Sequence, residues 1–228
     1  MKYDNIVEGR FLERPNRFIA YVELDGERQV CHVRNTGRCR ELLIPNESVV
    51  YVQEHEISAR RKTRYSLIGV RKNGYLINMD SQAPNRVVYE WLLKGGFLAD
   101  ITEIKKEYRY GSSRIDLFFK RGDKSCLMEV KGVTLEDNGV VRFPDAPTER
   151  GVRHIYELMA AAKEGYEAYI MFVVQMKGVK YFEPNDATHR EFGEALRKAK
   201  KAGVHIIAAD CNVEPDYLSI GDYVRVKL

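Results

Sequence analysis

Two apolar runs separated by a short polar segment constrain the fold of this chain more than any other feature. Residues 114–119 and 126–131 are rich in aliphatic and aromatic side chains that favour β-strands. The intervening residues 120–125 are Lys-Arg-Gly-Asp-Lys-Ser, which is typical of a turn. With the turn centred in the middle of this segment, antiparallel pairing places Asp116 directly opposite Glu129. The sequence therefore predicts a β-hairpin with two carboxylates facing each other across it.

Asp116, Glu129 and Lys131 form a charged group on one face of this predicted hairpin. Directly opposed side chains have Cβ atoms about 5 Å apart, and the period of two places Lys131 on the same face as Glu129. Two half-buried carboxylates at that distance repel each other unless they share a proton or bind a cation. Bound Mg²⁺ or Mn²⁺ would resolve this conflict, and the three residues would then be the catalytic group of a metal-dependent phosphodiesterase. The alternative is an ordinary hairpin whose charged side chains lie on a solvated face.

Basic residues are concentrated in one part of the first half of the chain. Residues 1–80 hold 14 Lys and Arg against 11 Asp and Glu. A local stretch of this half, residues 57–79, contains no acidic residue and has six basic ones: Arg60, Arg61, Lys62, Arg64, Arg71 and Lys72. Such a stretch could neutralise several DNA phosphates, although a solvated face explains many basic runs. We expect the first four of these side chains to contact DNA.

The first 81 residues have the pattern of a small β-barrel. Alternating apolar residues between turn signals predict strands at residues 17–24, 29–33, 48–53, 65–71 and 75–78. Short strands at this density favour an OB-like barrel, a fold that binds oligonucleotides on one sheet face. Arg34, Asn35 and Arg38 lie around a glycine between two of these strands, in a loop that could contact phosphate.

From Pro84 onward the apolar period changes and predicts a mixed α/β sheet with flanking helices. Asn85 is expected to cap the first helix and Thr148 the second. The predicted helices are residues 85–94, 149–164 and 189–202, and the strands beside the hairpin are 104–110, 168–174, 179–182 and 204–208, with a loop from the hairpin to Pro147. The chain is thus expected to be α/β (α+β overall), with an OB-like domain at 1–81 and a second domain at 82–228.

Arg150 and His154 lie four residues apart on one face of the helix predicted after Thr148. Arg150 near the helix start could bind a phosphate, and His154 could assist proton transfer or orient a ligand. A lone histidine on a helix is more often structural or solvated, so this pair gains weight only beside the hairpin.

Several classes of protein are disfavoured by what the chain lacks. It has no apolar run long enough to span a membrane, and no signal-peptide core follows its first residues, so we expect a cytoplasmic protein without a membrane partner. Its four cysteines show no metal or redox spacing, and no glycine-rich nucleotide fingerprint follows a predicted strand. Residues 223–228 alternate and could form an edge strand through which two copies pair as a homodimer.

With these elements assembled, the second half resembles the PD-(D/E)xK nuclease superfamily. The chain as a whole resembles the sugar fermentation stimulation protein A family, on the segments 35–38, 114–116, 129–135 and 143–151. This resemblance implies an N-terminal OB-like domain, a C-terminal nuclease-like domain, and nonspecific DNA binding linked to regulation of sugar (maltose) utilisation. In the superfamily an acidic residue from an early helix commonly joins the metal site, which points to Glu90 here. One departure is that Arg114 and Ile115 precede Asp116 where the superfamily has a proline-aspartate pair.

Two functions remain open from the sequence. The first is a nonspecific DNA-binding protein whose nuclease-like core holds Mg²⁺ or Mn²⁺ through Asp116, Glu129 and Glu90. The alternative is an active Mg²⁺-dependent nuclease in which Lys131 assists hydrolysis of DNA. The fold alone does not decide between them. We place DNA binding first, because the resemblance indicates binding and regulation more clearly than cleavage.

Overall fold

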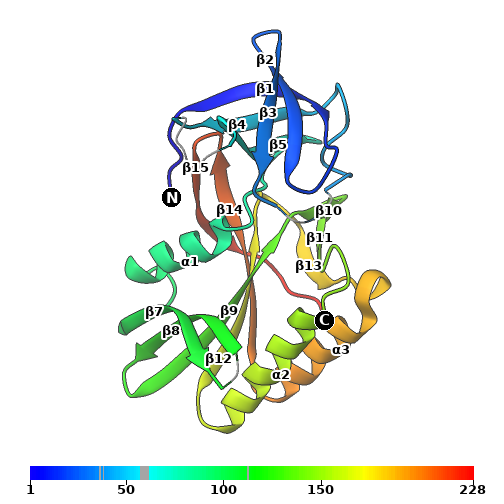
Figure 1. The fold of residues 1–228 in the computed structure, drawn as a ribbon. Coiled ribbons are helices and arrows are strands. Elements are labelled where there is room, and N and C mark those ends of the chain that lie inside the picture. Colours follow the sequence, from blue (N-terminus) through cyan, green and yellow to red (C-terminus); the bar gives the residue numbers. More distant parts are fainter. Residues whose placement is uncertain (36, 38, 57–61, 112) are drawn as a thin grey trace.

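A computed structural model describes residues 1–35, 37, 39–56, 62–111 and 113–228. A β-barrel lies above a mixed sheet, and three helices flank that sheet (Figure 1). The predicted class, an OB-like barrel followed by a mixed α/β sheet, is confirmed. No helix within the described ranges is long and apolar enough to cross a membrane.

The barrel is built from the first five strands, and the sixth extends the sheet outside the closed ring. The sheet order is β3-β2-β1-β4-β5-β6, and a parallel pairing of β3 with β5 closes the ring. The strands are β1 (Ile6–Glu13), β2 (Ile19–Leu24), β3 (Glu27–Val33), β4 (Val49–Glu54), β5 (Tyr65–Lys72) and β6 (Tyr75–Asn78).

The first of these strands, β1, was not among the five strands predicted from the sequence. It contains a glycine and several charged residues, so its alternation is weak. A Cβ on Gly9 would lie 2.6 Å from the carbonyl oxygen of Glu23, which explains why glycine is needed there. Close packing of β1 against β2 therefore overrides the weak strand signal.

The second sheet has the order β15-β14-β12-β9-β8-β7, in which β12 is parallel to both of its neighbours. A small sheet, β10-β11-β13, lies beside it. The strands are β7 (Ile101–Tyr110), β8 (Ser113–Arg121), β9 (Lys124–Val133), β10 (Leu135–Asp137), β11 (Val140–Phe143), β12 (Glu167–Val174), β13 (Tyr181–Pro184), β14 (His205–Glu214) and β15 (Tyr217–Tyr223).

The helices cover opposite faces of the second sheet. Helix α1 (Ala83–Leu93) lies on one face, and α2 (Glu149–Lys163) and α3 (Asp186–Lys201) lie on the other (Figure 1). Each face of the second sheet has its own apolar core, and alternate residues of the central strand β12 pack into one or the other. Ile170 and Phe172 lie on the α2 side, and Met171 and Val173 lie on the α1 side. This continuous apolar run is what a strand buried on both faces requires.

Two predictions in this half are wrong. The helix expected to begin after an Asn85 cap begins at Ala83, because Pro84 fits the first turn, and Asn85 lies inside the helix. The loop expected up to Pro147 contains β10 and β11, which are joined by a turn in which Asn138 and Gly139 both have positive φ. That dipeptide is a strong hairpin signal that the prediction overlooked.

The prediction of a free edge strand at residues 223–228 is also wrong. The chain end runs between β14 and β13: Val224 N donates to Ala208 O at 2.8 Å, and Phe182 N donates to Arg225 O at 2.9 Å. Lys227 N then donates to Phe182 O at 2.9 Å. These backbone groups are therefore engaged within the chain and do not offer an open edge to a second copy.

Buried polar contacts join the barrel to the second sheet. Asn78 N at the end of β6 donates to Gln175 O at 2.9 Å, and Gln175 Nε2 donates to Asn78 Oδ1 at 3.0 Å. The terminal ammonium of Met1 donates to Leu218 O at 2.6 Å, so the first residues pack on β15 rather than on the barrel. The division of the chain at residues 81 and 82 stays a prediction.

Candidate metal centre

The hairpin of β8 and β9 has the register expected from the sequence. Paired residues run from Arg121 opposite Lys124 to Leu117 opposite Met128, one position before Asp116 and Glu129. At that position Asp116 Oδ2 accepts a hydrogen bond from the backbone N–H of Val130 at 2.8 Å. The Asp116 side chain therefore reaches across to the backbone of β9 where the backbone pairing of the two strands ends.

Asp116 is held by contacts from two elements. Its Oδ1 accepts a hydrogen bond from the side-chain amide of Asn85 in α1 at 2.8 Å, and its Oδ2 accepts the bond from Val130. Burial disfavours the charged carboxylate and the negative charge of Glu129 adds repulsion, so the pKa of Asp116 is raised to about 6. The Asn85 contact was not predicted from the sequence, because Asn85 also suits a helix cap.

Glu129 is buried, and its two carboxylate oxygens differ in the hydrogen bonds that they accept. Oε1 accepts a hydrogen bond from Lys131 Nζ at 2.5 Å and also contacts His154 Nδ1. Oε2 is buried and has no hydrogen-bond partner among the residues that the structure describes. Burial alone would raise the pKa of Glu129, but His154 and Lys131 outweigh it and hold the pKa below its usual value. The result is a buried carboxylate with one oxygen left without a donor.

This arrangement fits a divalent cation. A buried acceptor without a partner is costly, and a cation would satisfy it and reduce the repulsion between Asp116 and Glu129. Carboxylate oxygens are the ligands that Mg²⁺ and Mn²⁺ prefer. Asp116 and Glu129 are the residues that would hold such an ion.

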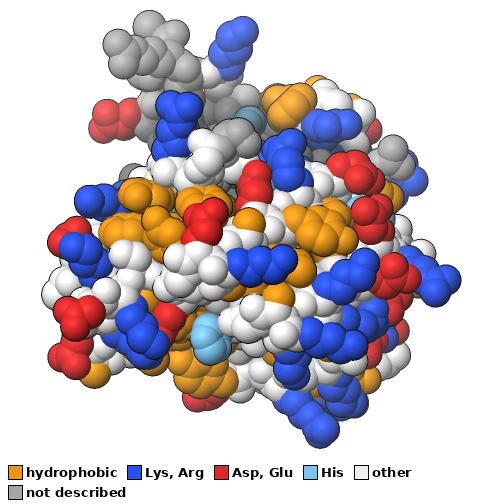
Figure 2. Space-filling model, turned by 90° about the horizontal axis from the view of Figure 1, so that it is seen from below, with side chains coloured by type: hydrophobic (Ala, Val, Ile, Leu, Met, Phe, Trp, Pro, Cys, Tyr) orange, Lys and Arg blue, Asp and Glu red, His pale blue; other side chains and the backbone are white. Residues whose placement is uncertain are grey.

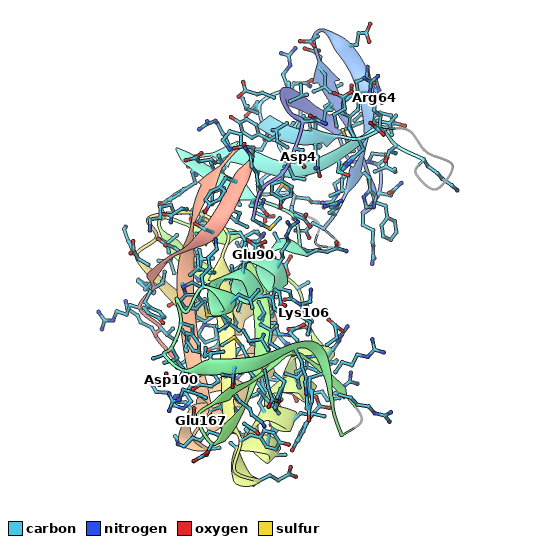
Figure 3. All side chains as sticks on the ribbon, turned by 90° about the vertical axis from the view of Figure 1, so that its left-hand side faces the viewer. Asp4, Arg64, Glu90, Asp100, Lys106 and Glu167 are labelled. Atoms are coloured by element: carbon cyan, nitrogen blue, oxygen red, sulfur yellow. The ribbon has the colours of Figure 1, made fainter. Side chains whose placement is uncertain are left out.

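Glu90, the third expected ligand, lies elsewhere on α1. Its carboxylate pairs with the terminal ammonium of Met1 at 2.9 Å and with Arg86 Nε at 3.1 Å. Figure 3 shows Glu90 at the level where the barrel and the second sheet meet. Glu90 is five positions after Asn85 on α1. The two side chains therefore point about 140° apart around the helix axis. The structure therefore brings Asn85, and not Glu90, to Asp116.

A second group of side chains could offer metal ligands. One atom each from Glu149, His189 and Glu191 lies within 4.8 Å of the others, a grouping that sequence reasoning missed. Both glutamates are exposed, so water satisfies their oxygens. The buried Glu129 oxygen has no such partner, and for this reason the pair on the hairpin is the stronger candidate.

The structure engages three of the expected DNA-contacting residues internally. Arg34 pairs with buried Asp80 at 3.1 Å, and the Asn35 amide donates to Met79 O at 3.0 Å. Arg64 Nε donates to Glu54 Oε1 at 2.7 Å. These side chains already donate hydrogen bonds within the protein, so fewer of their donors remain for DNA phosphates.

The other expected contacts are more exposed or are not described. Lys62 is exposed on the barrel. Arg150 is exposed at the start of α2, where its Nε lies 3.4 Å from His154 Nε2. The predictions for Arg38, Arg60 and Arg61 lie outside the described residues.

Segments singled out in the sequence meet in a cavity between the barrel and the second half of the chain. A cavity of about 200 Å³ is lined by Asn35 and Gly37 from the barrel loop, Thr134 after β9, Phe143 at the end of β11 and Asp145 after it. The fit is close, since a Cβ on Gly37 would lie 2.6 Å from Asp145 Oδ2. The barrel loop and the segments after β9 and β11 thus share this cavity, whose lining includes Gly132, the residue after Lys131.

Comparisons with known proteins agree with this architecture. Residues 12–79 match the family described as SfsA N-terminal OB domain, and residues 82–217 match the Sugar fermentation stimulation protein RE domain. A sugar fermentation stimulation protein homolog of Clostridium beijerinckii is 58% identical over 228 residues, covering 100% of both chains. The homolog of Desulfitobacterium hafniense strain Y51 is 57% identical over 100% of this chain and 99% of its own.

A solved structure is similar over the whole chain. Pyrococcus furiosus SfsA in complex with Ca²⁺ superposes with a TM-score of 0.90 at 28% identity, covering 100% of this chain and 98% of that one. The two family matches, the full-length relatives and this structure agree on both halves of the molecule. The chain therefore belongs to the sugar fermentation stimulation protein family.

Proposed function

We propose that this protein binds DNA nonspecifically and holds a divalent cation at Asp116 and Glu129. The observation that carries the proposal is Glu129 Oε2, a buried carboxylate oxygen without a donor among the described residues. The Ca²⁺ complex of the Pyrococcus furiosus relative supports a cation-binding family. Mg²⁺ or Mn²⁺ is the proposed ion here, because two carboxylates plus a substrate phosphate and waters suit these ions.

DNA is the proposed partner because anionic phosphates would complete such a site. Exposed Arg150 lies on the same helix as His154, which contacts Glu129. The last turn of α3 carries Lys198, Lys200 and Lys201, and Figure 2 shows Lys and Arg side chains gathered on the right of the face seen from below. Such contacts bind phosphates without reading bases. A regulatory role in sugar (maltose) utilisation is part of the proposal and is supported by the family name alone.

Hydrolysis of DNA is the second candidate function, favoured by the position of Lys131. Nonspecific binding of an anion does not require two acidic side chains beside it. A bound cation would lower the pKa of a water ligand and polarise the phosphoryl group. Asn85 and Val130 N–H orient Asp116, and the Lys131 ammonium beside Glu129 could stabilise developing negative charge or orient water.

Titration calorimetry with Mn²⁺ tests the cation site. We expect Glu129→Gln to weaken binding at least about 100-fold relative to wild type, because one ligand charge is lost. The matched control is Glu167→Gln. Glu167 is the first residue of β12, pairs with Arg121 and lies low on the sheet in Figure 3. Unchanged Mn²⁺ affinity in a folded Glu129→Gln protein would contradict the proposal.

A cleavage assay tests the second candidate. Purified protein is incubated with single- and double-stranded DNA and Mg²⁺ or Mn²⁺, beside a Glu129→Ala variant. Cleavage by the wild type that disappears in the variant supports hydrolysis. Equal cleavage by both proteins indicates a contaminating nuclease, and no cleavage by either leaves DNA binding as the function.

A further inference from the structure

We propose that Arg150, His154 and Glu129 form a hydrogen-bonded relay that links a phosphate-binding position at Arg150 to the metal-binding carboxylate. The inference rests on the proposed function and deepens it, because it assigns a positioning role to His154 and a ligand class to Arg150. The ligand class is a phosphate group of nucleic acid.

The central member of the relay, His154, is enclosed. It is 3% exposed, on the inward face of α2, so its ring nitrogens must find partners within the protein. Its Nδ1 contacts Glu129 Oε1, and its Nε2 lies 3.4 Å from Arg150 Nε. The four-residue spacing in α2 places Arg150 and His154 on one face of the helix, which makes the second contact possible.

The chemistry of arginine determines which histidine nitrogen carries the proton. A guanidinium group only donates hydrogen bonds, so His154 Nε2 must be the acceptor and carries no hydrogen. The ring hydrogen is then on Nδ1, which donates to Glu129 Oε1. In this arrangement the Glu129 carboxylate accepts from Nδ1–H, and Arg150 donates to Nε2 from the outside.

The relay explains why the two oxygens of Glu129 differ. Oε1 receives donors from both His154 and Lys131, whereas Oε2 receives none within the described part of the chain. Two donors on one oxygen fix the carboxylate plane and leave the other oxygen for the cation. Hydrogen bonds of this kind orient metal ligands, and their loss commonly costs 10- to 100-fold in metal affinity.

Arg150 connects the buried hydrogen bonds of His154 and Glu129 to the surface. It lies in the first turn of α2 and is exposed, and its hydrogen bond within the described part of the chain uses Nε. Its two terminal nitrogens therefore remain to bind two phosphate oxygens, beside a helix N-terminus that favours anions. A phosphate held there and a cation held by Glu129 share one hydrogen-bonded chain, so each should strengthen binding of the other.

Nitrogen-15 NMR of the histidine rings in metal-free protein tests the relay without any bound ion. We expect the His154 signals, assigned by their loss in His154→Asn, to show a hydrogen on Nδ1 and none on Nε2. In Arg150→Ala the Nε2 signal should shift, because this nitrogen loses its donor, whereas Nδ1 keeps its hydrogen against the Glu129 carboxylate. Arg153→Ala is the matched control, because Arg153 is exposed on the same helix and should leave the signals unchanged. A hydrogen on Nε2 in the wild type would overturn the relay.

Metal affinity tests the positioning role. By Mn²⁺ calorimetry, we expect His154→Leu to bind about 10- to 100-fold more weakly than wild type. In His154→Asn the side-chain amide can replace the Nδ1 donor, so affinity should recover toward the wild-type value. If His154→Leu does not fold, Arg150→Ala and Arg153→Ala give the same comparison at the surface. Equal affinities in folded His154→Leu and wild type would overturn the role.

Coupling is measured with thymidine monophosphate as the phosphate probe and Mg²⁺ as the ion. The probe should raise Mg²⁺ affinity in wild type about 5-fold or more, and this gain should disappear in Arg150→Ala and persist in Arg153→Ala. Persistence in Arg150→Ala would overturn the coupling. A wild type that binds neither Mn²⁺ nor Mg²⁺ would overturn the proposed function and the coupling, while the ring signals would still decide whether the relay exists.

Discussion

Two buried acidic residues of the same sheet, Glu129 in β9 and Asp210 in β14, differ in how their charges are satisfied. Both strands pair with β12, and the two side chains are almost equally buried. Asp210 Oδ1 accepts from Lys177 Nζ at 2.9 Å and from Asp222 N at 2.7 Å, and its Oδ2 accepts from Gly178 N at 3.1 Å. Glu129 has two donors on one oxygen and none on the other among the described residues.

The difference separates a structural acid from a candidate ligand. Each oxygen of Asp210 has a donor, and one of these donors is the Lys177 ammonium, so the charge is neutralised within the protein and the carboxylate holds local structure together. Glu129 is oriented as firmly but is incompletely satisfied. Burial of a charge is therefore not in itself a sign of a site. An oxygen without a donor is not sufficient either, since Glu136 Oε2 and Glu157 Oε2 share this property within the described ranges, and at Glu129 it gains weight from the second carboxylate, Asp116, beside it.

The largest expected effect is on stability, and it should follow Asp210. We expect Asp210→Ala to lower the free energy of unfolding by about 3 kcal/mol, because two backbone N–H groups and part of a lysine charge lose their acceptor. Glu129→Gln should change it by less than about 1 kcal/mol, since the amide oxygen can still accept from Lys131. Urea unfolding of both variants measures the contrast. A larger loss in Glu129→Gln would reverse the assignment of the two acids.

A smaller effect is expected from the pH dependence of Asp116. Its folded pKa is raised to about 6, above the ordinary value of 3.8, so the folded state holds the proton more tightly than the unfolded state. The stability due to that proton is complete below about pH 4, decreases as the pH rises and is lost above about pH 6. Asp116→Asn removes this dependence, so the metal-free variant should be about 1–2 kcal/mol more stable than wild type at pH 8.

Thermal unfolding at pH 4 and pH 8 measures this prediction. The two proteins should differ little at the lower pH and clearly at the higher one. Exposed Asp123→Asn, in the turn of the same hairpin, is the control and should behave as wild type at both. A destabilised Asp116→Asn protein at pH 8 would mean that Asp116 resembles Asp210 rather than Glu129.

The sequence was most informative where local chemistry is decisive. The turn at residues 120–125 determined the hairpin register, and the Thr148 hydroxyl caps α2 by accepting from Gly151 N at 3.1 Å, as predicted. Both depend on residues that are close in the chain. The Asn138–Gly139 turn was equally local and could have been recognised, because both residues suit the positive φ of a tight hairpin.

The contacts that complete the candidate site could not be predicted in the same way. Asn85 suits a helix cap by its type, and only the packing of α1 across the sheet brings its amide to Asp116. Glu90 was a reasonable ligand by analogy, but the Met1 ammonium lies 2.9 Å from its carboxylate. Both outcomes depend on how segments distant in sequence are placed, which residue type and spacing do not determine.

A third prediction compares these two residues of α1. We expect Asn85→Ala to weaken Mn²⁺ binding about 10-fold, or about 1.4 kcal/mol, because Asp116 loses the donor that orients it. Glu90→Gln should leave Mn²⁺ affinity within about 2-fold of wild type. Calorimetry of the two variants at one pH gives the comparison. The opposite result would indicate that Glu90 reaches the ion and that α1 moves when the ion binds.

The smallest expected effect concerns DNA, and it applies the same distinction between satisfied and unsatisfied charges to the barrel. Lys62 is exposed and has no ion-pair partner among the described residues, whereas Arg64 donates to Glu54. If Lys62 contacts a duplex phosphate, Lys62→Ala should reduce the slope of log affinity against log salt by about 0.9. Arg64→Ala should reduce it less, because Glu54 already neutralises that guanidinium. Fluorescence anisotropy from about 50 to about 300 mM salt measures both slopes. Equal reductions would show that the ion pair opens on DNA, and a partner seen in the free protein would then be a poor guide to the DNA contacts of the barrel.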